Sequence, residues 1–212
     1  TANGSEKIGG VAANLSLRVD GQSTTLVYVD ATKGWVNVQN AEDTGTGQLP
    51  AYIAGCGGNT TATVCTNFKV HTFTSPGTFT VTNAGNAGGG NKLSYLIIGG
   101  GGAGGGDGGG GGGAGGYRES KSPDGAYTAS PLALTTGLTV CATGYPITIG
   151  GGGAQYTSPP WSDHPASQGT PTTALGLVGA GGGRSSAAAG YNGGSGGGGG
   201  RGSPRTAGVG NT

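Results

Sequence analysis

The feature that most constrains this chain is the stretch from Gly99 to Gly116. All of its 18 residues except Ala103, Asp107 and Ala114 are glycine. Shorter glycine runs follow at 150–153, 181–183 and 193–202. Glycine has no side chain to bury in a hydrophobic core, and ordering it costs more backbone entropy than ordering any other residue. The runs must therefore either stay flexible as linkers or be ordered by hydrogen bonds of their own backbone.

Several glycine runs in one chain favour order. Each run can adopt a left-handed polyproline-II type helix, whose outward-pointing amide and carbonyl groups can bond to a neighbouring helix at close range. Collagen packs in this way, but it needs glycine at every third position, and these long pure runs lack that period. The sequence thus predicts packed polyglycine-II helices, and a disordered glycine linker between β domains is the competing interpretation.

Composition excludes several classes of protein. Glycine and proline make up 64 of 212 residues, and only 9% of residues are charged, against about 25% in ordinary globular domains. A formal net charge of +1 gives no electrostatic attraction to nucleic acid. No apolar stretch approaches the length of a transmembrane helix, and no signal peptide is visible. The chain begins at Thr1 and has no Met, so we expect a processed product or a segment of a longer protein.

Glycine is unevenly distributed, with 15 residues in 1–96 and 39 in 97–212, which indicates a boundary near Ile98. The first part is typical of β structure. Alternation at Leu15–Val19 and the runs Thr25–Val29 and Trp35–Val38 predict strands, with a turn at Asp30–Gly34. We expect a small β module at 1–49. Its apolar content is low, so packing against copies of itself would stabilise it.

A second unit is predicted at 50–96, ahead of a glycine-rich domain at 97–212. Phe68–Thr74 and Thr78–Val81 alternate around Ser75-Pro76-Gly77 and together predict a β-hairpin. His71 lies within the first of these strands, and we interpret it as a half-exposed strand residue. The expected fold is therefore all-β modules followed by polyglycine-II helices, with essentially no α-helix.

The motifs do not indicate catalysis. Matches to the dinucleotide-binding glycine pattern are unavoidable in so glycine-rich a chain, and no following helix or acidic residue supports them. The three cysteines have no zinc-ligand spacing, and we expect no metal and no cofactor. Cys56 and Cys65 could close a short disulfide loop in an oxidising environment, which would leave Cys141 alone, or all three could be inert thiols. We predict a protein that is not an enzyme.

Recognition is expected in the segments between the glycine runs, where aromatic and polar side chains gather. Tyr117–Tyr127 is one such segment and carries Arg118 and Glu119. The candidate receptor-binding residues are Tyr156, Trp161, Asp163, His164, Arg184 and Tyr191. In the alternative interpretation these aromatic side chains only cover the ends of the glycine bundle.

Several motifs occur in a fixed order along the chain: Phe68–Val81, Tyr95–Gly102, Gly112–Arg118 and Tyr145–Gly153. In order and spacing, the region from about 66 to 202 resembles the glycine-rich domains of bacteriophage tail fibres. Residues 8–38 resemble a small β module that often precedes such domains in structural proteins of marine phages. The resemblance implies a homotrimer, a layered polyglycine-II sandwich and variable loops that contact the bacterial surface. It also leads us to expect truncation at the C-terminal end, just after a glycine-rich run. Truncation at the start is expected from the strand pattern there, which has no visible beginning.

The resemblance leads us to expect a structural and receptor-binding segment of a tail fibre in the virion. Its partners would be its own copies, other tail proteins and a bacterial surface glycan or outer-membrane protein. The alternative is a self-assembling extracellular filament or virion decoration subunit with no receptor role. No nucleic-acid partner is expected.

Overall fold

The computed structural model describes residues 5–15, 23–38, 51–66, 68–86, 89–106, 108–120, 128, 130, 133–134, 136–155 and 166–210. These residues contain strands and turns but no helix, so the all-β prediction is confirmed for them. The strands are β1 (Leu26–Asp30), β2 (Gly34–Asn37), β3 (Ile53–Cys56), β4 (Thr60–Val64), β5 (Phe68–Thr72), β6 (Gly77–Ala84), β7 (Lys92–Leu93), β8 (Leu96–Ile98), β9 (Tyr117–Glu119), β10 (Leu138–Thr139), β11 (Gly144–Ile147), β12 (Thr172–Ala174) and β13 (Leu177–Gly179).

The chain divides into two compact units. The first comprises Thr1–Ala54, Thr82–Asn91 and Val140–Ala142, and the second comprises Gly55–Val81, Lys92–Thr139 and Thr143–Thr212. The second unit contains the glycine runs. The boundaries predicted at 49 and 96 stay a prediction.

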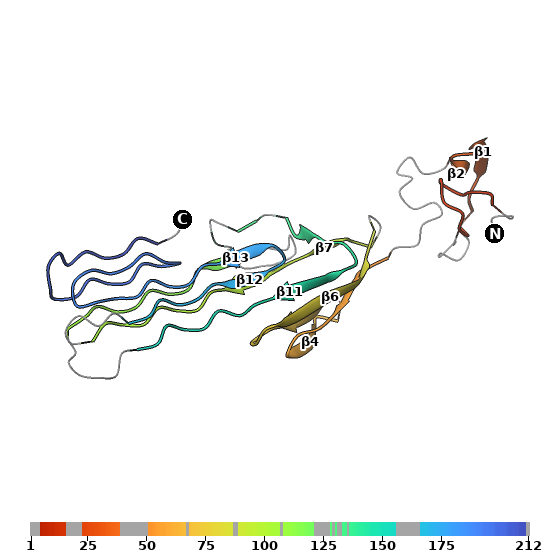
Figure 1. Cartoon of the computed structure of the whole chain (residues 1–212). Helices are drawn as coiled ribbons and strands as arrows, with labels where there is room; N and C mark the ends of the chain where they lie inside the picture. The colour runs from red at the N-terminus through yellow and green to blue at the C-terminus, as the bar shows by residue number, and fades with distance from the viewer. Residues whose placement is uncertain are drawn as a thin grey trace. The chain divides into compact units, whose positions relative to one another are not determined.

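In the first unit, β1 and β2 form the antiparallel hairpin expected around Asp30–Gly34 (Figure 1). Asp30 Oδ1 accepts the backbone N–H groups of Thr32 and Lys33, each at 2.7 Å. Backbone hydrogen bonds from Lys33 and then Thr32 lower the pKa of the Asp30 carboxyl, because they stabilise its charged form. The strand predicted at Leu15–Val19 lies outside the described residues except for Leu15.

The hairpin predicted for Phe68–Val81 is wrong in its pairing, although both strands exist. β5 pairs with β4, whereas β6 lies in another sheet between β11 and β3. The Asn59 side chain redirects the chain after β5, because its Oδ1 accepts the N–H groups of Thr74 at 2.8 Å and Ser75 at 3.1 Å. Gly57 and Gly58, with φ of +112° and +98° that glycine adopts without strain, turn the chain from β3 into β4. The turn that folds β5 back against β4 contains Cys65 and Thr66, whose φ angles of +48° and +66° are also positive.

A small hydrophobic core joins the strands of the second unit. Its buried members are Ile97 of β8, Ile147 of β11 and Ala174 of β12. Partly buried side chains surround them: Phe73, Phe79, Tyr95, Ile149, Leu175 and Leu177. Pro146 lies in β11, an outer strand of its sheet, where a residue without an N–H group is tolerated. This core anchors the strands from which the glycine runs extend.

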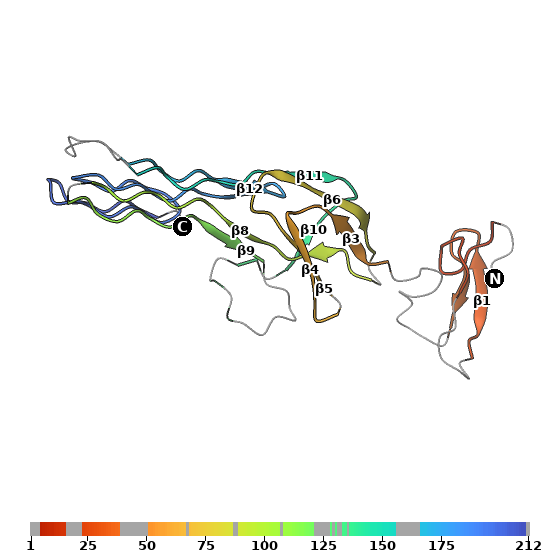
Figure 2. The same ribbon diagram turned by 90° about the horizontal axis from the view of Figure 1, so that it is seen from below.

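Beyond the strands, extended segments run side by side and exchange backbone hydrogen bonds (Figures 1 and 2). These glycine runs occupy 99–106, 108–116, 149–155, 166–171, 180–186, 187–193, 194–202 and 205–210. The bonds recur every third residue. In one series Gly99, Gly102 and Gly105 donate to the carbonyls of Gly116, Gly113 and Gly110 at 3.0, 2.8 and 3.0 Å. In another, Ser195, Gly198 and Arg201 donate to those of Ala114, Gly111 and Gly108.

The same period governs where glycine is required. A Cβ atom on Gly182 would overlap the Gly113 carbonyl oxygen and lie 2.6 Å from the Gly102 nitrogen. A Cβ on Gly111 would meet nothing within 4 Å, and three residues further along the same run stands Ala114, which is exposed. Positions such as Gly182, where a Cβ would overlap a neighbouring run, therefore exclude any side chain, whereas outward positions accept one. The buried Ala103 and Ser185 show that a few inward positions hold a very small side chain.

Candidate functional site

The structure describes two of the six predicted receptor-binding residues and brings them together. They are Arg184 and Tyr191. The other four, Tyr156, Trp161, Asp163 and His164, lie outside the described residues. Arg184 belongs to run 180–186, and Tyr191 belongs to the next run, 187–193. The Tyr191 N–H donates to the Arg184 carbonyl oxygen at 2.9 Å, which sets the two side chains side by side.

The Arg184 guanidinium carbon lies 3.6 Å from the centroid of the Tyr191 ring. This is a cation–π contact, worth about 0.5–1 kcal/mol at an exposed site. The Tyr191 side chain is 43% exposed, and Arg184 is half-buried. The contact restricts the motion of both side chains and presents an aromatic ring at the surface of the glycine runs.

One nitrogen of this pair is buried without a hydrogen bond. Arg184 Nη1 donates to no acceptor in the part of the chain that the structure describes. Nearby, Gln168 Nε2 donates to the Asn192 carbonyl oxygen at 2.7 Å, and Asn192 Oδ1 accepts the Val209 N–H at 2.7 Å. An exposed aromatic ring held beside polar side chains is an arrangement suited to binding a polar ligand.

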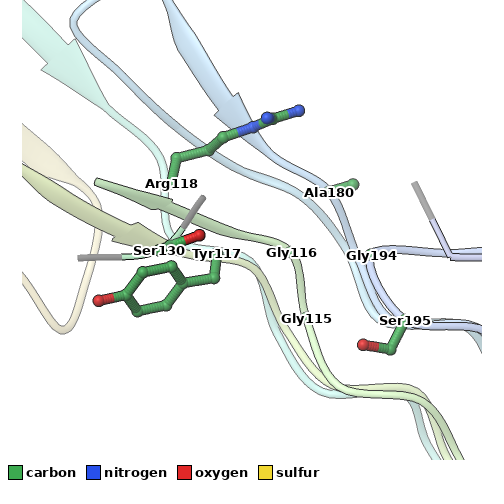
Figure 3. A pocket seen from close by; sticks show the side chains of 8 residues that line it. All are labelled: Gly115, Gly116, Tyr117, Arg118, Ser130, Ala180, Gly194 and Ser195. Atoms are coloured by element: carbon green, nitrogen blue, oxygen red, sulfur yellow. The ribbon is translucent and has the colours of Figure 1, made fainter. Parts of the chain in front are cut away.

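A second candidate is a half-open cavity of about 190 Å³ where β9 meets the glycine runs (Figure 3). Its walls are formed by Gly115, Gly116, Tyr117, Arg118, Ser130, Ala180, Gly194 and Ser195. The Tyr117 side chain is 46% exposed. Tyr117 and Arg118 extend on opposite sides of β9, as successive strand residues do (Figure 3).

Glu119 holds two residues of this cavity in place. Its side chain is only 5% exposed, and its Oε2 accepts the Tyr117 hydroxyl at 2.9 Å. Its Oε1 accepts the Ser130 backbone N–H at 2.6 Å. Burying a carboxylate costs free energy unless it is hydrogen-bonded, so Glu119 depends on these two hydrogen bonds in its buried position. Its hydrogen bonds fix the orientation of the Tyr117 ring and the position of the Ser130 backbone.

The sequence prediction treated Tyr117–Tyr127 as a loop, and the structure corrects its first three residues. Tyr117–Glu119 form β9, which pairs with β8 through Leu96↔Glu119 and Ile98↔Tyr117. The cavity itself was missed, because Ala180, Gly194 and Ser195 reach it from distant parts of the sequence. The available signal was the position of Tyr117 and Arg118 as the first large side chains after a long glycine run.

The remaining predicted residues have structural surroundings. Cys56 and Cys65 are exposed free thiols, so the suggested disulfide is not formed in this structure. His71 is half-buried in β5, where its Nδ1–H donates to the Gly57 carbonyl oxygen at 2.7 Å and its ring packs edge-on against Phe79. Within the described ranges, no group of three metal-ligating side chains gathers, and no helix has the length and apolarity to cross a membrane.

Comparison with known sequences identifies the framework of this site. The family model of the glycine-rich domain matches residues 72–212, which include every glycine run, the cavity and the Arg184–Tyr191 pair. No curated protein and no solved structure matches the chain. Since the family model covers well over half of the sequence, the chain belongs to the glycine-rich domain family.

Proposed function

We propose that this chain is a structural and receptor-binding segment of a bacteriophage tail fibre. In this proposal its glycine runs are polyglycine-II helices, and their outward side chains bind the bacterial surface without catalysis. The observation that carries the proposal is the Arg184–Tyr191 pair, in which a guanidinium holds an exposed aromatic ring on a framework of backbone hydrogen bonds. The ordered motifs that resemble tail-fibre domains lend further support.

The hydrogen-bond period supports the polyglycine-II assignment. A polyproline-II type helix has three residues per turn, so every third amide points in the same direction. In run 99–106, the amides of Gly99, Gly102 and Gly105 donate to one neighbouring run, and those of Gly100 and Ala103 donate to another, at Thr170 and Ser167. A β-strand would repeat every second residue instead.

Amide hydrogen exchange followed by NMR tests this assignment. We expect Gly102 and Gly105 to exchange slowly, because their amides donate to other runs. Gly101 and Gly104, whose amides donate to no described residue, should exchange much faster. Uniformly fast exchange across 99–106 would contradict packed helices and favour the flexible linker.

The binding proposal extends to the partners. We propose a homotrimer attached to other virion tail proteins, with a bacterial surface glycan or outer-membrane protein as the receptor and no nucleic-acid partner. Tyr156, Trp161, Asp163 and His164 remain proposed contributors to the same binding surface. A rigid framework of hydrogen-bonded glycine runs suits this role. Side chains held on a rigid backbone lose little conformational entropy on binding.

Immunogold electron microscopy of the native particles tests the location. We expect label on the fibres of a virus tail, and label along an open filament without a virion would overturn the proposal. A cell-binding assay on a panel of bacteria then tests the site. Tyr191→Ala should weaken binding, whereas Tyr52→Ala, which removes another exposed tyrosine, should not. Equal binding by both variants would remove the Arg184–Tyr191 pair from the receptor site.

One observation favours the alternative of a self-assembling filament subunit. Gly101, Gly104 and Gly111 face outward, with no atom closer than 3.5 Å to a Cβ built on them, and their amides donate to no described residue. A second copy could continue the hydrogen-bond pattern there, as a strand adds to an open sheet edge. Sedimentation distinguishes the two functions. Gly111→Val should abolish assembly in a filament subunit and leave a closed tail-fibre trimer intact.

A further inference from the structure

We infer that the cavity beside Tyr117 binds a single sugar ring. The inference rests on the proposed function in that a bacterial surface glycan would supply the sugar, but it concerns a site separate from the Arg184–Tyr191 pair. The cavity lies where β9 meets runs 108–116 and 194–202 (Figure 3).

The size of the cavity limits the ligand. Sites for drug-sized molecules occupy about 300–1,000 Å³, so a cavity of about 190 Å³ accommodates a single ring and not an extended molecule. The cavity is also half-open toward solvent. A ring within a longer glycan could therefore enter while the rest of the glycan stays outside.

The walls combine one aromatic face with several unmet polar groups. Tyr117 contributes a half-exposed ring. The Ser195 hydroxyl, the Gly115 amide and the Gly194 carbonyl hydrogen bond to no described residue, and the hydroxyl points toward the backbone at Gly115 (Figure 3). A sugar ring matches this set, because its C–H face packs on an aromatic ring while its hydroxyls both donate and accept.

The polar walls disfavour an apolar ligand. Arg118 also lines the cavity and adds a cationic residue to them. A purely apolar ligand would leave the hydroxyl and backbone groups without partners, which costs free energy when they are desolvated.

The cavity is preformed. Glu119 fixes the Tyr117 hydroxyl and the Ser130 amide from a buried position. The glycine walls cannot acquire side chains, since a Cβ on Gly115 would overlap the Gly99 carbonyl oxygen and one on Gly194 would overlap the Gly116 nitrogen. The ligand therefore meets fixed backbone and an oriented ring, an arrangement that lowers the entropy lost on binding.

Saturation-transfer NMR on the full chain tests the site, with the methyl glycosides of glucose, galactose, mannose and N-acetylglucosamine as probes. We expect at least one glycoside to bind, with transfer strongest to the protons of one ring face. Tyr117→Ala should weaken that binding about tenfold, which corresponds to the loss of one aromatic contact. Tyr52→Ala, which removes an exposed tyrosine outside both proposed sites, is the matched control and should leave it unchanged. Binding of none of the four, or equal binding by Tyr117→Ala, would overturn the inference.

Tyr117→Phe separates loss of the ring from loss of folding. It keeps the ring and removes the hydroxyl that donates to Glu119, so we expect lower thermal stability but retained glycoside binding. If Tyr117→Phe loses binding as completely as Tyr117→Ala while remaining folded, stacking on the ring is not the basis of recognition. Cell binding that survives without any glycoside signal would leave the proposed function standing and overturn the sugar site alone. If immunogold places the chain on an open filament and the chain still binds a glycoside, the sugar site stands and the proposed tail-fibre function is overturned.

Discussion

Two regions of the second unit are held together in opposite ways. Around β8, β11 and β12, buried side chains form a small hydrophobic core that includes Ile97 and Ile147. In the glycine runs, the backbones themselves are in contact, and hydrogen bonds at a three-residue period link them. Stability in the core depends on which side chains are present. Stability in the glycine runs depends on the absence of side chains at the positions where backbones meet.

The comparison shows where sequence information lies in each region. In the core, the inward positions are occupied by apolar side chains. In the glycine runs, the inward positions are restricted to residues without a side chain, or with a very small one, and the outward positions can vary. Ala114, Tyr191 and Val209 are outward and exposed, whereas Gly181, Gly182 and Gly183 each face a neighbouring backbone.

The strongest test of this difference is Gly182→Val. The Cβ alone would overlap the Gly113 carbonyl oxygen, and neither backbone can move away without breaking its own hydrogen bonds. We expect a loss larger than the about 1–3 kcal/mol typical of overpacking, enough to unfold the glycine runs. Circular dichroism and limited proteolysis measure the effect. An unchanged melting temperature would contradict close packing at this position.

The matching test of the core is Ile97→Ala. Ile97 is 5% exposed, and its truncation should cost about 2–5 kcal/mol through lost burial and a cavity. Chemical denaturation measures the change. If the two regions are held independently, amide protection in runs 187–193 and 205–210 should persist in this variant. Its complete loss would show that the runs depend on the core.

A smaller effect is expected at Ser185, the one polar side chain with no exposed surface among the described residues of the runs. Its hydroxyl donates to the Gly198 carbonyl oxygen at 2.7 Å. Ser185→Ala should cost about 1–3 kcal/mol, because a buried carbonyl loses its partner. Ser195→Ala, which alters an exposed hydroxyl, is the control in the same denaturation experiment. Equal stability of the two variants would argue against a buried position for Ser185.

The smallest effect should have the opposite sign. Gly111 faces open space and does not need a positive φ, so Gly111→Ala should stabilise the chain by about 0.4–1 kcal/mol by reducing the entropy of the unfolded state. Gly112→Ala on the next residue should destabilise it, because its Cβ would overlap the Gly102 carbonyl oxygen. Thermal melts of the pair measure the contrast, and a shift in the same direction for both would refute the outward and inward assignment.

Local sequence patterns predicted much of the β structure. Alternation and turn residues located β1, β2, β5 and β6, because these depend on neighbouring residues. The pairing of β5 with β4 was not predicted, since it depends on the Asn59 side chain and on a turn at Cys65 and Thr66, two non-glycine residues with positive φ. Which strands pair with each other produces no periodic pattern along the sequence.

The site was only partly predictable for a related reason. Arg184 and Tyr191 stood out as side chains between glycine runs, and the structure adds that their side chains are in contact. Their contact depends on a backbone hydrogen bond between adjacent runs, and therefore on the register of those runs. A run of identical glycine residues does not specify that register. The cavity beside Tyr117 needs the same register, because Ser195 lies 78 positions away in the sequence.

The scarcity of side chains in the glycine runs has a consequence for temperature. Unfolding usually raises the heat capacity by about 12–15 cal/mol/K per residue, because apolar surface becomes hydrated, whereas newly exposed polar surface lowers it. The glycine runs expose mainly peptide groups when they separate. Their heat-capacity change should therefore be small, and their stability should vary almost linearly with temperature. A domain built in this way would retain its stability at low temperature, where hydrophobic cores weaken.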